Sequence, residues 1–277
     1  MNTTEKIGVG IVTCNREEFF NKCLESIPRN LIDQLVVVND GEQLSKIPED
    51  VEYIYNVENL GVGKSKNILF KKLLENNTHI FIIEDDIFIK NPNVFEQYIK
   101  TAKEFGILHL LFGYHGPANR KNYQSHNPPY YRLKIEGENC NVIYNECCVG
   151  AFCYYHKDCL DAIGLIDEEF YNAFEHVEHS YRACLANYCG IYWYWPDIDK
   201  SWEYLDEAAC SEESSSIKSK TPESNAKWEE NILNSLNHFK KKHGVTPAWI
   251  EPMIQDPKIE EVMDQIKKTK KQNYGKI

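Results

Sequence analysis

The sequence lacks any long apolar run. No apolar stretch approaches the ~18 to 20 residues that a bilayer span needs, so we expect no transmembrane helix. The first fifteen residues, MNTTEKIGVGIVTCN, contain no basic segment followed by a long apolar core, which argues against a secretory signal. None of the ten cysteines forms a Cys-x-x-Cys pair, and in a chain without a signal they indicate reduced thiols. We therefore expect a cytoplasmic protein.

Positive charge is also scarce, since 31 Lys and Arg stand against 42 Asp and Glu, for a formal net charge of -11. This balance argues against non-specific binding of nucleic acid through the whole surface. Two nucleotide-binding motifs are missing as well. No Gly-x-Gly-x-x-Gly follows the first apolar strand, and GVGKS at 61–65 lacks the glycine that a P-loop needs five residues before its Gly-Lys pair, where Glu58 stands.

The chain of 277 residues, 42% hydrophobic and 26% charged, fits one large globular domain or a domain with an appendage. Apolar strands alternate with amphipathic helices in its first half. This alternation predicts right-handed crossovers and an α/β fold with a mainly parallel sheet. The expected strands are 7–12, 35–41, 51–56 and 79–86, and the expected helices cover about 17–27 and 61–75.

The second half is less regular, and its aromatic and small residues favour a mixed extension of the sheet. We expect an aromatic strand over 191–198 that ends at Pro196. We divide the chain into a main domain at 1–205, a flexible loop or lid at 206–225 that orders when substrate binds, and a helical appendage at 226–277. The other expected strands lie near 107–116 and within 141–156, and the other expected helices near 158–167, 174–188, 224–243 and 258–272.

The stretch IFIIEDDIF, residues 80–88, places Glu84, Asp85 and Asp86 directly after a buried strand. Burial of an ionised carboxylate is costly unless the group is paired or binds a metal. A polar loop after a core strand is the alternative interpretation. Two other strands also end in polar clusters, at 13–16 and 39–41. Because ligands bind beyond the carboxyl ends of parallel strands, this convergence favours a functional site.

Taken together, these segments resemble the family 2 glycosyltransferases of the GT-A fold, over about residues 7–185. The motifs of that family match, in order, Thr13-Cys14-Asn15-Arg16, Asn39-Asp40-Gly41, Asn59 with Gly61 and Lys66-Asn67, Glu84-Asp85-Asp86, Gly150-Ala151, Gly164 to Phe170, and Glu175-His176-Val177-Glu178 with Arg182.

The resemblance implies transfer of a sugar from a nucleotide-diphosphate sugar to an acceptor hydroxyl, with inversion and with help from Mn²⁺ or Mg²⁺. It also implies a nucleotide-sugar half at about 1–90 and an acceptor half at about 91–205. The acceptor is a glycan or another hydroxyl-bearing molecule, and a nucleic acid is not excluded. Asp86 is the expected metal ligand, with His179 as a further candidate. The expected donor-binding residues are Thr13, Asn15, Arg16, Asp40, Lys66, Asn67, Glu84 and Asp85.

The sequence departs from the family at the catalytic base, because His176 stands where an Asp is usual. An imidazole titrates near neutrality and can also accept the acceptor's proton. Three alternatives stay open here: Glu175 as the base, His176 or His179 as a metal ligand, and a structural histidine. No histidine follows in 196–207, where many GT-A enzymes bind their metal. For the acceptor we expect contacts with Trp202 and Glu178.

Two other functions remain open at this stage. A non-catalytic module that binds sugar nucleotides or glycans on the same fold would explain the missing Asp. A nucleotidyltransferase would also hold a metal with carboxylates on an α/β sheet. It usually needs a Gly-rich basic loop after the first strand, however, and TCNREE is not such a loop.

Overall fold

A computed structural model of the chain describes residues 5–115, 131, 133–190, 194–208, 222–247 and 259–273. Its centre is a six-stranded sheet in the order β3-β2-β1-β4-β9-β6. The first four of these strands run parallel, as expected for an α/β fold. They are β1 (Ile7–Thr13), β2 (Gln34–Asn39), β3 (Glu52–Tyr55) and β4 (His79–Glu84).

The register of the parallel strands brings their polar ends together. Thr13 lies opposite Asn39, and Val12 lies opposite Glu84. The three polar clusters that follow β1, β2 and β4 therefore lie at one edge of the sheet, which confirms the predicted convergence.

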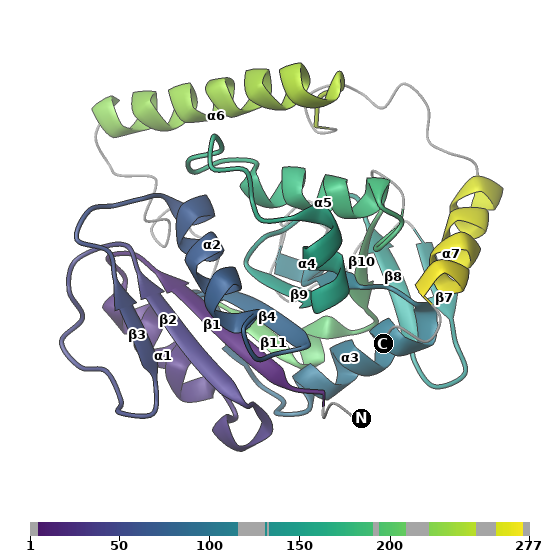
Figure 1. The fold of residues 1–277 in the computed structure, drawn as a ribbon, viewed down its shortest axis with the longest axis horizontal. Helices are drawn as coiled ribbons and strands as arrows, with labels where there is room; N and C mark the ends of the chain where they lie inside the picture. The colour runs from purple at the N-terminus through teal and green to yellow at the C-terminus, as the bar shows by residue number, and fades with distance from the viewer. Residues whose placement is uncertain are drawn as a thin grey trace.

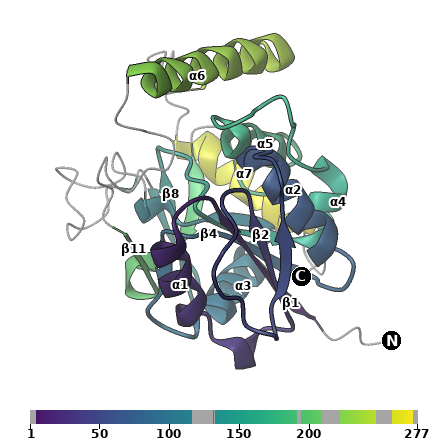
Figure 2. The same ribbon diagram turned by 90° about the vertical axis from the view of Figure 1, so that its left-hand side faces the viewer.

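Helices cover both faces of this half of the sheet (Figures 1 and 2). Helix α1 (Glu17–Ser26) packs on one face, and α2 (Val62–Leu73) packs on the opposite face. The amphipathic pattern after β1 predicted α1, which buries Phe20, Cys23 and Leu24. Helix α3 (Val94–Phe105) was not predicted. It begins two residues after Pro92 and packs Phe95 against Phe81 of β4, with ring centroids 4.7 Å apart.

The second half of the chain completes the sheet with antiparallel pairs, so the predicted mixed character is confirmed. Strand β9 (Phe152–His156) pairs with β4, and β6 (His109–Leu111) pairs with β9. Helices α4 (Lys157–Ile163) and α5 (Glu175–Leu185) follow β9 and lie on the same side as α2 (Figure 2).

Two smaller sheets accompany the main one. The first has the order β10-β8-β7, from β10 (Trp195–Ile198), β8 (Asn141–Asn145) and β7 (Leu133–Glu136). Our expectation that Pro196 ends its strand was wrong, because Pro196 lies inside β10, opposite Tyr144. Strand β10 is an edge strand of this sheet, and an edge tolerates a residue without an N–H donor.

The second small sheet pairs β5 (Ile87–Ile89) with β11 (Leu205–Glu207). Short 3-10 turns lie at Arg29–Leu31 (η1), Gly113–His115 (η2) and Ser201–Glu203 (η5). The expected lid at 206–225 overlaps strand β11 at its start and helix α6 (Pro222–His243) at its end. Residues 209–221 lie outside the described residues.

The expected helical appendage consists of α6 and α7 (Ile259–Asn273). Helix α6 runs across α5 (Figure 1), where Phe239 is fully buried among Phe170, Phe174 and Tyr181. Helix α7 adds Val262 and Ile266 to the main hydrophobic core. Both helices are thus packed onto the main domain. Among the helices of the described ranges, none is long and apolar enough to cross a membrane.

Candidate active site

The acidic cluster after β4 is divided between the two faces of the sheet. Neighbouring residues of a strand point to opposite faces. Glu84 points toward α2, where its Oε1 accepts a hydrogen bond from Lys66 Nζ at 2.7 Å. Asp85 points toward α1 and accepts a hydrogen bond from Thr13 Oγ1 at 2.7 Å. The last residue of β4 and the first residue of the turn that follows it thus take part in two different charge networks.

On the α1 side, Arg16 connects the two aspartates. Its guanidinium donates to Asp86 Oδ2 at 3.1 Å and also to Asp85 Oδ1. Asp85 is fully buried, and burial raises the pKa of its carboxyl to about 7, although the charge of Arg16 and the hydrogen bond from Thr13 act in the opposite direction. The predicted donor residues Thr13, Arg16 and Asp85 therefore meet in one network, with Asp85 beneath the surface.

Asp86 has one oxygen that the protein does not use. Its Oδ1 is buried and has no hydrogen-bond partner among the described residues. Buried polar atoms usually have a partner, so this atom is suited to an incoming ligand. A carboxylate oxygen fits Mg²⁺ or Mn²⁺, and Mg²⁺ commonly takes one or two carboxylates together with substrate phosphates and water. Within the described ranges, no group of three His, Cys, Asp or Glu residues is arranged to hold a metal by itself.

On the α2 side, Lys66 is the centre of the network. Its buried Nζ donates to Glu84 at 2.7 Å, to the Gly150 carbonyl at 3.1 Å and to Glu175 Oε1 at 3.4 Å. Burial acts to lower the pKa of Lys66, but the two carboxylates outweigh it and the pKa is raised. The pKa of Glu84 is lowered, because the charge of Lys66 and its hydrogen bond outweigh burial. Lys66 thus stabilises two ionised carboxylates.

Helix α5 begins with the residues expected to perform the chemistry. Phe174 adopts a left-handed conformation with φ 63°, and Glu175 is the first helical residue. His176 Nδ1 lies 3.0 Å from Glu175 Oε1, and the side chains are 26% and 4% exposed, respectively. An ionised carboxylate only accepts hydrogen bonds, so Nδ1 carries a proton, and in the neutral form of the ring Nε2 has a lone pair.

Glu175 stays ionised in this arrangement. Burial acts to raise the pKa of its carboxyl, but the neighbouring His176 and Lys66 outweigh burial and hold the pKa well below the usual range. A negative charge in the first turn of a helix is also favoured by the helix dipole.

Gly150 explains why the predicted segment Gly150-Ala151 needs small residues. A Cβ at position 150 would lie 2.6 Å from His176 Cγ and 2.9 Å from His176 Nδ1. A side chain there would displace the imidazole. The glycine therefore sets the position of the ring relative to Glu175.

Asp40 and Asn15 hold loops at the same edge of the sheet. The Asp40 carboxylate accepts hydrogen bonds from the backbone N–H groups of Leu60 and Gly61, each at 2.8 Å, and so fixes the loop that leads into α2. Asn15 has φ 56°, and its Oδ1 accepts from Glu42 N at 2.6 Å. Their contact with a nucleotide remains a prediction.

Three of the expected site residues make close contacts within the protein. Asn67 bonds the backbone N–H and carbonyl of Ile166, which ties α2 to the segment before α5. His179 is fully buried, and its ring nitrogens lie 3.1 Å from the Tyr155 hydroxyl and 2.9 Å from the Gly164 carbonyl. Both nitrogens therefore have partners within the protein, and the role of His179 as a metal ligand stays a prediction.

Glu178 also has partners within the protein, and its contact with an acceptor stays a prediction. Its carboxylate is fully buried and accepts from Arg182 Nε at 2.9 Å, His243 Nε2 at 2.9 Å and Lys242 Nζ at 3.0 Å. The last two residues come from α6. No local pattern in the sequence reveals partners more than sixty residues away.

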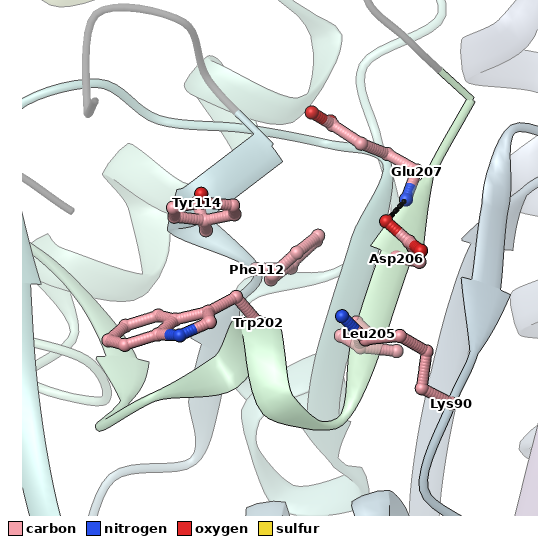
Figure 3. A pocket seen from close by; sticks show the side chains of 7 residues that line it. All are labelled: Lys90, Phe112, Tyr114, Trp202, Leu205, Asp206 and Glu207. Carbon is pink, nitrogen blue, oxygen red and sulfur yellow. Dashed lines mark hydrogen bonds between the residues drawn. The ribbon is translucent and has the colours of Figure 1, made fainter. Parts of the chain in front are cut away.

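Trp202 lies in η5, half-buried, with its ring centroid 5.5 Å from that of Tyr114. It lines a pocket beside β11 (Figure 3). Trp202 was predicted to contact the acceptor, but the other residues of this pocket were not predicted; they come from three separate segments, at 90, 112–114 and 205–207.

The profile described as Glycosyl transferase family 2 matches residues 8–164, more than half of the chain. The chain belongs to this family. A relative from Acanthamoeba polyphaga mimivirus, described as an uncharacterized glycosyltransferase, is 29% identical over 234 residues, which cover 76% of this chain and 85% of the relative. Membership confirms the resemblance drawn from the ordered motifs, and it supports glycosyl transfer as the activity.

Solved structures confirm the GT-A fold of this family 2 member. The structure of GalNAc-T7 with UDP, GalNAc and Mn²⁺ gives a TM-score of 0.56 at 11% identity, over 92% of this chain and 57% of that one. The structure of TarS from S. aureus gives a TM-score of 0.52 at 15% identity, over 97% of this chain and 54% of that one. The chain thus spans little more than half the length of either protein, and the likeness concerns the fold alone.

Proposed function

We propose that this family 2 glycosyltransferase moves a sugar from a nucleotide-diphosphate sugar to an acceptor hydroxyl with inversion, and that His176 is the general base. The Glu175–His176 pair carries the proposal, with Nδ1 and Oε1 3.0 Å apart and the imidazole 26% exposed. It lies next to the carboxyl end of β4, since Lys66 contacts both Glu175 and Glu84.

The chemistry follows from this geometry. His176 Nε2 takes the proton of the acceptor hydroxyl while its oxygen attacks the anomeric carbon. The bond between that carbon and the diphosphate oxygen breaks, and the diphosphate leaves from the opposite side. Glu175 orients the imidazole through Nδ1 and stabilises the imidazolium that forms, as the carboxylate of a catalytic triad does. Lys66 keeps Glu175 ionised and in place.

The donor is proposed to bind at the ends of β1, β2 and β4, near Asn15, Arg16, Asp40 and Glu84. Asp86 would hold a divalent cation, Mn²⁺ or Mg²⁺, through its unpartnered Oδ1. When bound, this cation would neutralise the charge that develops on the leaving diphosphate. The presence of UDP and Mn²⁺ in the GalNAc-T7 structure supports the choice of ligand classes.

A donor screen with the full chain tests the proposal. Calorimetry with UDP-, GDP-, TDP- and CMP-sugars in the presence of Mn²⁺ should identify a donor, and release of free nucleotide then measures turnover. We expect His176→Ala to lower turnover by about 10² to 10⁴-fold, the usual contribution of a general base, while donor affinity stays within about twofold. His238→Ala is a matched control, since His238 lies on α6 and is 29% exposed.

Three results would argue against it. If no nucleotide sugar binds, the donor class is wrong. If His176→Ala keeps full turnover, the base is wrong. If a donor binds but the wild-type chain shows neither transfer nor hydrolysis, the non-catalytic module is the better description.

The proposal keeps a cytoplasmic location, which predicts that the cysteines are free thiols. Within the described ranges, Cys23, Cys153 and Cys159 are free thiols, and Cys184 Sγ lies 3.1 Å from Cys189 Sγ. Alkylation of the native protein purified under non-oxidising conditions, followed by mass spectrometry, should leave no disulfide-linked peptides.

A further inference from the structure

We propose that a pocket beside β11 binds one pyranose ring of a saccharide acceptor. We call it the aromatic pocket; it is lined by Lys90, Phe112, Tyr114, Trp202, Leu205, Asp206 and Glu207. This inference rests on the proposed function, because it assigns the acceptor class of that reaction. Its test uses saccharide binding alone and therefore does not depend on the donor or on the base.

The pocket has the size of a single ring. Its volume is about 140 Å³. Sites for drug-sized ligands are larger, roughly 300 to 1,000 Å³. A longer saccharide would therefore place one unit inside the pocket and the others outside it.

The lining is divided into an aromatic side and a polar side (Figure 3). The rings of Phe112, Tyr114 and Trp202 lie to one side, and Asp206 and Lys90 lie to the other. Phe112 is fully buried and forms the floor, whereas Trp202 is half-buried and presents part of its indole to the pocket. The ring centroids of Trp202 and Tyr114 are 5.5 Å apart at an interplanar angle of 37°. Together they form a rigid aromatic wall.

This combination matches the surface of a pyranose. Such a ring has an apolar face of C–H groups, which packs on an aromatic ring, and a rim of hydroxyls, which need acceptors. Ionised carboxylates are the strongest acceptors for hydroxyl donors. Asp206 is exposed on the side of the pocket opposite the aromatic wall, and its Oδ1 accepts from the Glu207 backbone N–H at 3.0 Å, which orients its carboxylate.

The pocket is directly connected to the acidic cluster. Glu207 of β11 lies opposite Ile87 of β5, the residue that follows Asp86. The next residue, Ala208, donates its N–H to the Asp86 carbonyl at 2.8 Å. A ring held in the aromatic pocket would thus lie beside the proposed diphosphate site, as an acceptor must.

The charges of the pocket disfavour a nucleic-acid acceptor. An aromatic wall also suits a nucleobase, but Asp206 and Glu207 would repel the phosphates on either side of it. Lys90 is the single cation among the lining residues, and the whole chain carries a formal charge of -11. A neutral saccharide fits this environment better.

The experiment titrates the full chain with the methyl glycosides of glucose, galactose, mannose and N-acetylglucosamine, observed by saturation-transfer NMR without donor or metal. We expect at least one of them to bind. Trp202→Ala should weaken its affinity about tenfold, and Trp202→Phe should keep most of it. Trp228→Ala is a matched control, because Trp228 is also half-buried but lies on α6, outside the pocket.

Asp206→Asn is the second variant, and its exposed position makes a folding defect the less expected outcome. It should weaken the same glycoside while the thermal unfolding midpoint is unchanged. The proposal is overturned if no glycoside binds the wild-type chain, if both variants bind like the wild type, or if a thymidine oligonucleotide binds through Trp202 where the glycosides do not. Failure of the donor screen would leave these results unaffected.

Discussion

At the scale of single residues, Gly150 makes the sharpest prediction, because its missing side chain leaves the space that His176 fills. Gly150→Ala should push the imidazole away from Glu175 and lower kcat by about 10²-fold, which is the usual effect of displacing a catalytic group by about 1 Å. The KM for the donor should change little. Steady-state kinetics with the donor found in the screen gives both values, and an unchanged kcat would show that the ring tolerates the added methyl group.

Lys66 gives a second prediction at this scale, which concerns the free energy of unfolding. Lys66→Met leaves Glu84 and Glu175 without their shared cation. Removal of one partner from a buried ion pair typically costs about 3 to 5 kcal/mol of unfolding free energy. Urea denaturation measures this cost, and adding Glu175→Gln to Lys66→Met should restore part of it.

The matched control is Lys72→Met on the same helix. Lys72 pairs with Glu52 at the surface, with both side chains more than a third exposed. Such a pair contributes about 0 to 1 kcal/mol. Equal losses for the two lysine variants would contradict the role given to Lys66.

At the scale of elements, α6 is held by an apolar cluster centred on Phe239 and by a set of charges. Phe239 is fully buried among residues of α5 and the preceding loop. Phe239→Ala should cost about 3 to 5 kcal/mol of local stability and release α6, since large-to-small changes at such sites have that cost. Hydrogen exchange of the α6 amides should then speed up. Leu233→Ala, 58% exposed on the same helix, should leave the exchange unchanged.

The polar contacts of α6 offer an alternative explanation of how this helix is held on the main domain. Lys242 and His243 reach Glu178, and His238 lies 3.0 Å from Asp167 Oδ2. If these pairs alone held the helix, Phe239→Ala would leave the exchange of α6 as slow as in the wild type. That result would show that the ion pairs, and not the apolar cluster, hold α6 on the main domain.

The elements that the sequence predicted are those with strong local patterns. β1, β2, β4, α1 and α2 have clear periodicity, and their polar ends were placed at one edge correctly. Helix α3 was overlooked although it also has a clear amphipathic pattern, with Phe95, Tyr98 and Phe105 on its buried face. Strands β5 and β11 are only three residues long. Short strands depend on their partner strand for stability, so no local sequence pattern predicts them.

The candidate site likewise has a part that local sequence patterns predicted and a part that they did not. The ordered motifs located Glu84 to Asp86 and Glu175-His176, because these residues follow recognisable strands and helix starts. The roles of Glu178, His179 and Asn67 were not predictable, because their partners are distant in the chain. A same-face helical spacing shows which side chains are neighbours but not which of them face solvent.

At the scale of the whole molecule, stability should depend on pH through buried Asp197. Burial raises the pKa of this carboxyl from 3.8 to about 7, although it accepts hydrogen bonds from Tyr98 and Ser201 at 2.7 and 2.6 Å. Between about pH 4 and pH 7 the unfolded chain has lost this proton and the folded chain keeps it. The contribution of Asp197 to stability therefore decreases as the pH rises through that window and is constant above it.

Asp197→Asn removes this titration. Other groups, such as Glu175, have lowered pKa values and act in the opposite direction, so the comparison between wild type and variant is the relevant measure. Across the window the wild type should lose on the order of 4 kcal/mol more than the variant, which corresponds to the pKa shift. Urea unfolding at several pH values tests this, and parallel curves would contradict it.

The position of β9 between β4 and β6 also bears on how the chain reaches its native state. β4 ends at residue 84 and its partner β9 begins at residue 152, so the apolar edge of β4 stays open until almost seventy further residues have been synthesised. An open hydrophobic strand edge is a template for pairing with other chains. The nascent N-terminal half, which already carries the acidic cluster but not yet His176, therefore exposes a strand edge that can pair with other chains.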